Sequence, residues 1–198
     1  IVSNPSDADR IGVVSIGSGA YNSNNYSVAI GEGAYNTNTY STSIGTDAYS
    51  QATYATAVGN FARIVGSSTM AVAIGYAAYV YNSPQGISVG RGCQAKGTDA
   101  VSIGFEAGIR STASQGQHIA IGSNAGCKGS QGIAFGYRAT ARGDYSIAIG
   151  HSVAYDGDSS VATPYSISLG SYASAPTSGL VIGAGSNNHI LSGQFNDT

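Results

Sequence analysis

The 198-residue sequence is poor in charge, has two cysteines and contains no tryptophan. Charged residues make up 9% of it, against about 25% in an ordinary soluble domain. With a net charge of −2, it lacks the basic surface that nucleic-acid binding requires. No apolar run approaches the roughly 18 residues of a membrane-spanning helix. Two cysteines are too few for a disulfide scaffold.

What the chain has in excess is small residues, with 29 glycines among them, and 14 tyrosines. A five-residue phrase recurs from end to end, as in residues 146–150 (SIAIG): polar or small, aliphatic, small, aliphatic, glycine. The commonest spacing of its glycine is 14 residues, and a fixed period of this kind indicates a repeat architecture. The turn glycines of the phrase are Gly17, Gly31, Gly45, Gly59, Gly75, Gly90, Gly104, Gly122, Gly136, Gly150, Gly170 and Gly183.

The alternation within the phrase has the period of a β-strand, and the final glycine allows a sharp turn. Three residues after the glycine, alanine is the commonest residue, and seven after it Gly or Asn is common, as at Asn24 and Gly66. Because Gly and Asn accept a left-handed backbone, we expect a second corner there. Each unit then reads strand, turn, strand, turn, without room for a helix. The sequence predicts an all-β parallel β-roll or solenoid of about 12 rungs, each of roughly 14 residues.

Large residues opposite small ones would fill the inside of such a coil without voids. The aliphatic positions of the phrase are therefore predicted to point inward, towards the alanines of the second strand. The Ala or Ser between them would face outward and permit close packing against other chains, which favours a homotrimer. The predicted coil core is Val28, Ile30, Val72, Ile74, Val101, Ile103, Ile119, Ile121, Ile133, Phe135, Ile147, Ile149, Ile167 and Leu169.

The repeats define the domain organisation. Residues 1–13 are expected to be a lead-in that caps the first rung, 14–186 the repeats, and 187–198 the start of a following segment, so that the chain is a fragment of a larger protein. Two longer units, with extra residues around 108–117 and 156–165, predict surface loops, often on a binding side.

Tyrosines concentrate at two repeat positions. Five residues before the glycine stand Tyr26, Tyr40, Tyr54, Tyr145 and Tyr165. If the alanine three after the glycine points inward, its neighbour at the fourth position points outward, forming a surface column of aromatic rings. This column is a candidate ligand-binding surface, and the alternative is a stabilising ladder. Its members are Tyr21, Tyr35, Tyr49, Arg63 and Tyr79.

No other residues form a convincing chemical site. Cys93 and Cys127 lie two rungs apart, too far for a disulfide, and are predicted to be free, buried thiols. His118, His151 and His189 lack metal-ligand spacing, and residues 156–158 (DGD) are an isolated acidic pair. We expect no catalytic residues, no metal and no cofactor.

The repeats, for example residues 27–31 (SVAIG) with Ala34 and residues 146–150 (SIAIG), resemble the YadA-like head repeat of trimeric autotransporter adhesins. The resemblance implies a left-handed β-roll, a homotrimer at the tip of a bacterial surface fibre, and adhesion to cell-surface or extracellular-matrix proteins or glycans. It also implies virulence as the setting and an extracellular position on an outer-membrane fibre. Similar repeats occur in phage and prophage tail fibres, and that alternative remains open.

Two other functions fit the pattern poorly. An ice-binding solenoid needs a threonine column on every rung, whereas Thr37, Thr42 and Thr53 occupy different repeat positions. A carbohydrate-processing β-helix enzyme needs clustered carboxylates, whereas Asp47, Asp99 and Asp144 are dispersed. The sequence therefore favours a non-enzymatic adhesive head.

Overall fold

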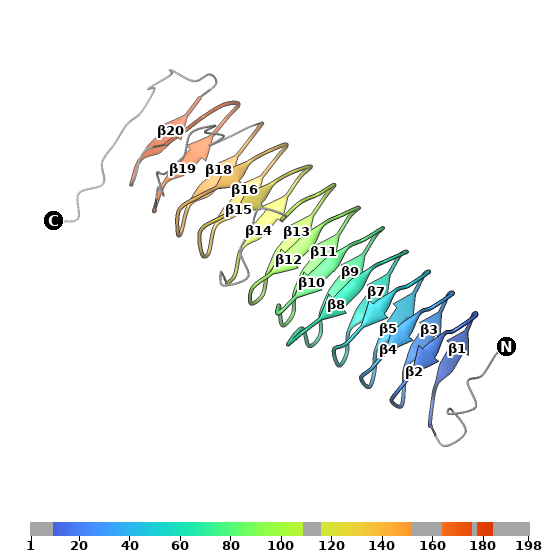
Figure 1. Cartoon of the computed structure of the whole chain (residues 1–198). Helices are drawn as coiled ribbons and strands as arrows, with labels where there is room; N and C mark the ends of the chain where they lie inside the picture. The colour runs from blue at the N-terminus through green and yellow to red at the C-terminus, as the bar shows by residue number, and fades with distance from the viewer. Residues whose placement is uncertain (1–9, 109–115, 152–163, 176–177, 184–198) are drawn as a thin grey trace.

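The computed structural model describes residues 10–108, 116–151, 164–175 and 178–183. Over these residues the chain winds as a flat coil into a long rod, with successive coils stacked from the N-terminal to the C-terminal end (Figure 1). All regular structure in the described residues is short parallel β-strand, and no helix there could cross a membrane. The predicted parallel β-solenoid is confirmed, with a 12-stranded sheet along its length.

The long sheet contains one strand from each repeat phrase. Its members, in spatial and chain order, are β1 (Val14–Ile16), β3 (Val28–Ile30), β5 (Thr42–Ile44), β7 (Thr56–Val58), β9 (Val72–Ile74), β11 (Ile87–Val89), β13 (Val101–Ile103), β14 (Ile119–Ile121), β16 (Ile133–Phe135), β18 (Ile147–Ile149), β19 (Ile167–Leu169) and β20 (Leu180–Ile182).

Eight of the coils have a second strand in the described residues, and it belongs to the opposite wall. A six-stranded sheet contains β2 (Tyr21–Asn22), β4 (Tyr35–Asn36), β6 (Tyr49–Ser50), β8 (Arg63–Val65), β10 (Tyr79–Tyr81) and β12 (Gln94–Lys96). A two-stranded sheet contains β15 (Gly126–Cys127) and β17 (Thr140–Ala141).

The register is kept from coil to coil even across the longer units. Val101 pairs with Ile119, and Ile147 pairs with Ile167, just as Val14 pairs with Val28. The extra residues of these units therefore leave the ladder undisturbed. Most of the predicted loops, the acidic pair of 156–158, His189 and the segments 1–9 and 184–198 lie outside the described residues.

The glycine that ends each phrase holds the coils at their spacing. Gly45 has a φ of 130°, which side-chain-bearing residues rarely adopt. A Cβ atom added to it would lie 2.6 Å from the carbonyl carbon of Gly59 in the next coil. The same clash with the next glycine recurs along the column, for example from Gly75 to Gly90. Glycine is therefore required both for the turn and for the close approach of successive coils.

The left-handed residues lie only in part where the sequence predicted them. Gly66, Asn82 and Gly97 adopt positive φ seven residues after a phrase glycine, but Asn24 does not. The more regular left-handed positions are two after the glycine, as at Asp47 (φ 52°), and five before it, as at Tyr40 (φ 56°). The Asn24 side chain has a different task, because its amide donates to the carbonyl of Thr37 in the next coil.

The predicted orientation of the first strand was wrong. The residue in the middle of the phrase is the one that points inward: Ala29, Ala73 and Ala134 have no exposed surface. The flanking aliphatic residues face out, and Ile149 is 40% exposed in the single chain while Ala148 beside it is 1% exposed. The same inversion applies to the whole set predicted as coil core: Val28, Ile30, Val72, Ile74, Val101, Ile103, Ile119, Ile121, Ile133, Phe135, Ile147, Ile149, Ile167 and Leu169.

The reason is that two small-residue walls face each other inside the coil. Ala34, Ala48 and Ala62 on the second wall are fully buried, as are the middle residues of the first. With small side chains on both walls, the two sheets pack closely and leave little space for longer side chains. The inside differs along the rod: Asn36 donates to the side-chain carbonyl of Asn22 near the N-terminus, whereas later coils hold an apolar cluster around Ile64.

The outer face of the 12-stranded sheet is consequently apolar along the rod. Each strand contributes two outward residues, and in all twelve strands these are aliphatic or aromatic apart from Thr42 and Thr56. Ile16, Ile103 and Phe135 are 44%, 37% and 52% exposed. None of these outward positions holds a charged residue. We call this surface the aliphatic face.

A substitution on one strand tests which side is inside. Ala57→Leu adds bulk between the two walls and is expected to destabilise the fold by about 1–3 kcal/mol, because Ala57 is fully buried among the residues of an apolar cluster. Thermal unfolding followed by circular dichroism measures the effect. Thr56→Leu, on the outward side of the same strand, is the matched control and should leave the fold intact. Equal destabilisation by the two changes would contradict the assignment.

Candidate functional site

The tyrosine column lies on the outer side of the six-stranded sheet. Ala34 and Asn36, the neighbours of Tyr35 in the chain, are fully buried, so Tyr35 itself points outward. The strands pair Tyr21 with Tyr35, Tyr35 with Tyr49, and Tyr49 with Arg63. The rings of Tyr21 and Tyr35 stack with centroids 4.9 Å apart, and those of Tyr35 and Tyr49 with centroids 5.5 Å apart.

Both ends of this stack are covered by arginine. The guanidinium of Arg10 lies 5.5 Å from the centre of the Tyr21 ring, and that of Arg63 lies 5.6 Å from the centre of the Tyr49 ring. The ring faces are thus occupied by each other and by two cations. The stack offers ring edges and hydroxyl groups to a ligand, and it cannot act as a face-stacking platform.

A second set of stacked tyrosines lies at the left-handed position before each phrase. Tyr26 and Tyr40 stack at 5.1 Å, Tyr40 and Tyr54 at 4.9 Å, and Tyr145 and Tyr165 at 5.1 Å. These tyrosine residues are between 47% and 63% exposed. A left-handed backbone at a non-glycine residue costs roughly 1–2 kcal/mol, and stacking between adjacent coils offsets part of that cost.

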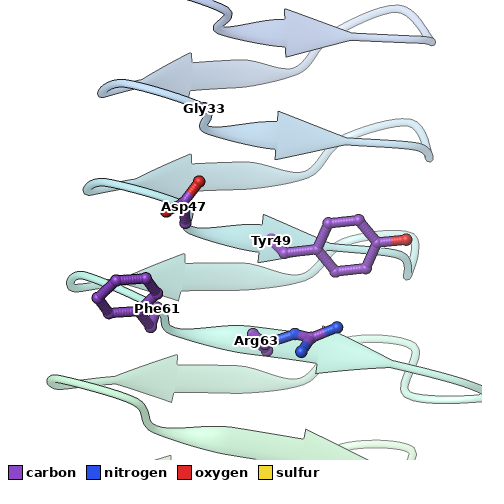
Figure 2. Close-up of a pocket in the computed structure, with 5 residues that line it drawn as sticks. All are labelled: Gly33, Asp47, Tyr49, Phe61 and Arg63. Carbon is purple, nitrogen blue, oxygen red and sulfur yellow. The ribbon is translucent and has the colours of Figure 1, made fainter.

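A surface depression of about 280 Å³ interrupts the pattern at the third and fourth coils. Its lining residues are Gly33, Asp47, Tyr49, Phe61 and Arg63. Figure 2 shows Asp47 and Phe61 at the turns and Tyr49 and Arg63 on the strands that follow. Asp47 and Tyr49 belong to one coil, and Phe61 and Arg63 belong to the next.

The repeat explains why the depression forms at this height. Positions two and four after the glycine point outward, and the alanine between them, Ala48 or Ala62, is buried inside the coil. A trough therefore runs between the two columns of outward side chains. In the first two coils Gly19 and Gly33 leave its turn side open, whereas Asp47 and Phe61 supply a wall.

The charged groups of the depression are available for a ligand. Neither the Asp47 carboxylate nor the Arg63 guanidinium forms a hydrogen bond or an ion pair with any other residue in the described ranges. Sequence reasoning included Tyr49 and Arg63 among the candidates but missed Asp47 and Phe61 as partners. The signal was present, because both occupy a position where Gly19 and Gly33 stand in earlier repeats.

Three titratable side chains, those of Cys93, Cys127 and His118, are buried inside the coil. Cys93 and Cys127 are free and buried, as predicted. Burial raises the pKa of the Cys93 thiol, and raises that of Cys127 to about 12, so both thiols are unreactive at neutral pH. His118 occupies an inward position, and burial lowers its pKa to about 4. Neither of its ring nitrogens has a hydrogen-bond partner among the described residues.

His151 is exposed and lies in an aromatic row. Its ring centroid lies 5.1 Å from that of Tyr137 and 5.2 Å from that of Tyr172. Over the described ranges, no group of three or more His, Cys, Asp or Glu side chains could hold a metal ion. The most distinctive outward features of the described residues are therefore the stacked tyrosines, the depression beside them and the aliphatic face.

The described residues thus form a parallel β-solenoid with a repeated SxAIG-like strand and an apolar outer face. Comparison with known families gives the more particular result: residues 37–62 and 128–152 match the YadA head domain repeat. The resemblance seen in the sequence is thereby confirmed. The search of curated proteins returned no match.

Removing one ring tests whether the tyrosine column stabilises the rod. Tyr35→Ala deletes two stacking contacts and is expected to lower stability by about 1–3 kcal/mol, measured by chemical unfolding. Gln94→Ala, at the same repeat position in β12, should have a smaller effect because Gln94 has no ring to stack. Equal effects from the two substitutions would show that stacking does not stabilise the column.

His118 makes the coil sensitive to acid. Its folded-state pKa of about 4 lies below the ordinary value of 6.5, so the unfolded chain binds the proton more tightly. The stability is complete above pH 6.5 and falls towards pH 4, by on the order of 3 kcal/mol per chain. Unfolding measured across this range should show that slope.

The matched variant is His118→Ala, which copies Ala100 at the same position of the preceding coil. It is expected to flatten the pH dependence between pH 6.5 and 4. An unchanged slope in this variant would assign the acid sensitivity to other groups.

Proposed function

We propose that this chain is the non-enzymatic adhesive head of a homotrimeric surface fibre, exposed outside a bacterial cell and binding cell-surface or matrix proteins or glycans. The observation that carries the proposal is the aliphatic face. An apolar surface running the length of a rod, without charged residues, has the composition of a protein interface. Its occupant in this proposal is a second and a third copy of the same chain, with the coil left-handed as in the YadA head repeat.

Three arguments support a self-interface over a foreign partner. The face is regular along the 12-stranded sheet, so an identical repeat matches it at every coil. The small residues inside each coil bury little apolar surface of their own, so a single rod leaves much of its apolar area in water. The match to the YadA head domain repeat adds independent support. Three faces meeting at one axis would close the assembly without an open apolar surface.

The remaining outer surface is then available for adhesion. The six-stranded sheet carries the tyrosine column and the depression on the opposite wall of the coil from the aliphatic face. Three copies of one surface around an axis would convert weak single contacts into tight polyvalent binding.

A second candidate is a phage or prophage tail-fibre segment used for host recognition or spacing. The observation that favours it is the pair of thiols Cys93 and Cys127, since cysteine is uncommon in exported autotransporter passengers. Both candidates require the same trimeric rod, and they differ in the particle that carries it.

Light scattering after size-exclusion chromatography tests the assembly. A trimer of 19.8 kDa chains is expected at three times that mass, about 59 kDa. The double variant Ile103→Asp with Ile149→Asp places two charges on the aliphatic face and should dissociate the trimer. Gln94→Asp, on the opposite sheet, is the matched control and should remain trimeric.

Two results would contradict the proposal. A wild-type mass near that of one chain would show that the protein is not a trimer. A double variant that stays trimeric would show that the interface does not lie on the aliphatic face. Binding of the wild-type trimer to arrays of matrix proteins and glycans and to host cells tests adhesion, and its absence on all three would remove the adhesive function.

A further inference from the structure

We propose that the depression bounded by Asp47, Tyr49, Phe61 and Arg63 is a binding site for one neutral sugar residue of a glycan. The inference rests on the proposed adhesive function and deepens it, by assigning the ligand class and the site. A volume of about 280 Å³ lies near the lower end of ligand-pocket volumes, which suits a single ring better than an extended polymer.

The charges of the site favour a neutral, hydroxyl-rich ligand. Asp47 contributes an acceptor and Arg63 a set of donors, and among the described residues neither side chain forms a hydrogen bond or an ion pair. Each sugar hydroxyl can donate and accept, so neighbouring hydroxyls of one ring can satisfy both groups together. The lining side chains carry one negative and one positive charge, which gives no net attraction to an anionic or a cationic ligand.

The two aromatic residues of the depression, Tyr49 and Phe61, offer different groups to a ligand. Both faces of Tyr49 are covered, by Tyr35 and by Arg63, so Tyr49 offers its edge and its hydroxyl group. Phe61 is 44% exposed and has a single edge-on aromatic contact, with Tyr76 at 5.7 Å. At least one face of the Phe61 ring has no aromatic or cationic partner among the described residues. That face can pack against the apolar C–H side of a sugar ring.

The backbone positions the two turn residues of the site. Asp47 and Phe61 adopt left-handed φ values of 52° and 59°, as does the residue two after the glycine in the other described coils. The Asp47 carboxylate lies against Gly33, in the space that a side chain at position 33 would need, because a Cβ added to Gly33 would lie 2.5 Å from a carboxylate oxygen.

The test uses the trimer of the 198-residue chain and two readouts. A glycan array measures binding to oligosaccharides, and saturation-transfer difference NMR measures binding of methyl glycosides of neutral hexoses and N-acetylhexosamines. Asp47→Gly and Arg63→Gln each remove a charge-assisted hydrogen bond and should lower saccharide binding at least tenfold. Both replacements copy residues that the chain already carries at the same repeat positions, Gly33 and Gln94, so folding should be preserved.

Matched controls lie at the left-handed position two after the glycine, in coils outside the depression. Glu106→Gly repeats the acidic-to-glycine change three coils from Phe61, and Arg138→Gln repeats the arginine-to-glutamine change in a more distant coil. Both should bind saccharides as the wild type does. Phosphocholine serves as a zwitterionic competitor and should not displace the methyl glycosides.

The outcomes separate this inference from the proposed function. Saccharide binding that survives both Asp47→Gly and Arg63→Gln would overturn the site, and displacement by phosphocholine would overturn the ligand class. A wild-type trimer that binds no saccharide but still adheres to matrix proteins would also overturn the inference, while leaving the adhesive function standing. Loss of saccharide binding in both variants, with both controls unaffected, is the expected result.

Discussion

The close approach of one coil to the next at the phrase glycine is the constraint on which the rest of the structure depends. The glycine column brings backbone directly against backbone, and any Cβ at Gly45 or Gly75 would enter the carbonyl group of the following coil. This contact fixes the register, so that equivalent residues of successive coils lie side by side. Every column on the surface, apolar, aromatic or charged, inherits its regularity from that spacing.

The narrow interior has a consequence for the outside. Small residues such as Ala57 and Ala62 meet across the coil, and the larger apolar residues of the same strands are left on the surface. An ordinary domain hides its aliphatic side chains within one chain. This rod has too little room to do so, and its aliphatic face is the structural reason to expect self-association. Stability and assembly are therefore linked by the width of the coil.

The same regularity separates scaffold from candidate site. Where identical aromatic residues recur, as at Tyr21, Tyr35 and Tyr49, their faces are used up in stacking on one another. Where the outward residues differ from coil to coil, as from Gly33 to Asp47 and Phe61, side chains with unused hydrogen-bonding and stacking capacity gather around a hollow. Recognition in such a rod is thus expected at the irregularities, and the periodic surface supplies support and multiple copies.

The sequence by itself determined the repeat, the parallel strands, the corner glycines, and the free, buried state of Cys93 and Cys127. These features could be predicted because the glycine spacing and the two-residue alternation are visible in the sequence of each repeat, and stacking adds further copies of the same unit. Alternation shows which residues share a face, but it is symmetric, so it could not say which face lies inside. Only the tertiary structure decided that Ala148 is buried and Ile149 exposed, since the distance between the two walls sets the size of the side chains that fit. The depression could also be found only in the tertiary structure, because Asp47 and Arg63 are 16 residues apart in the chain and become neighbours only when one coil lies on the next.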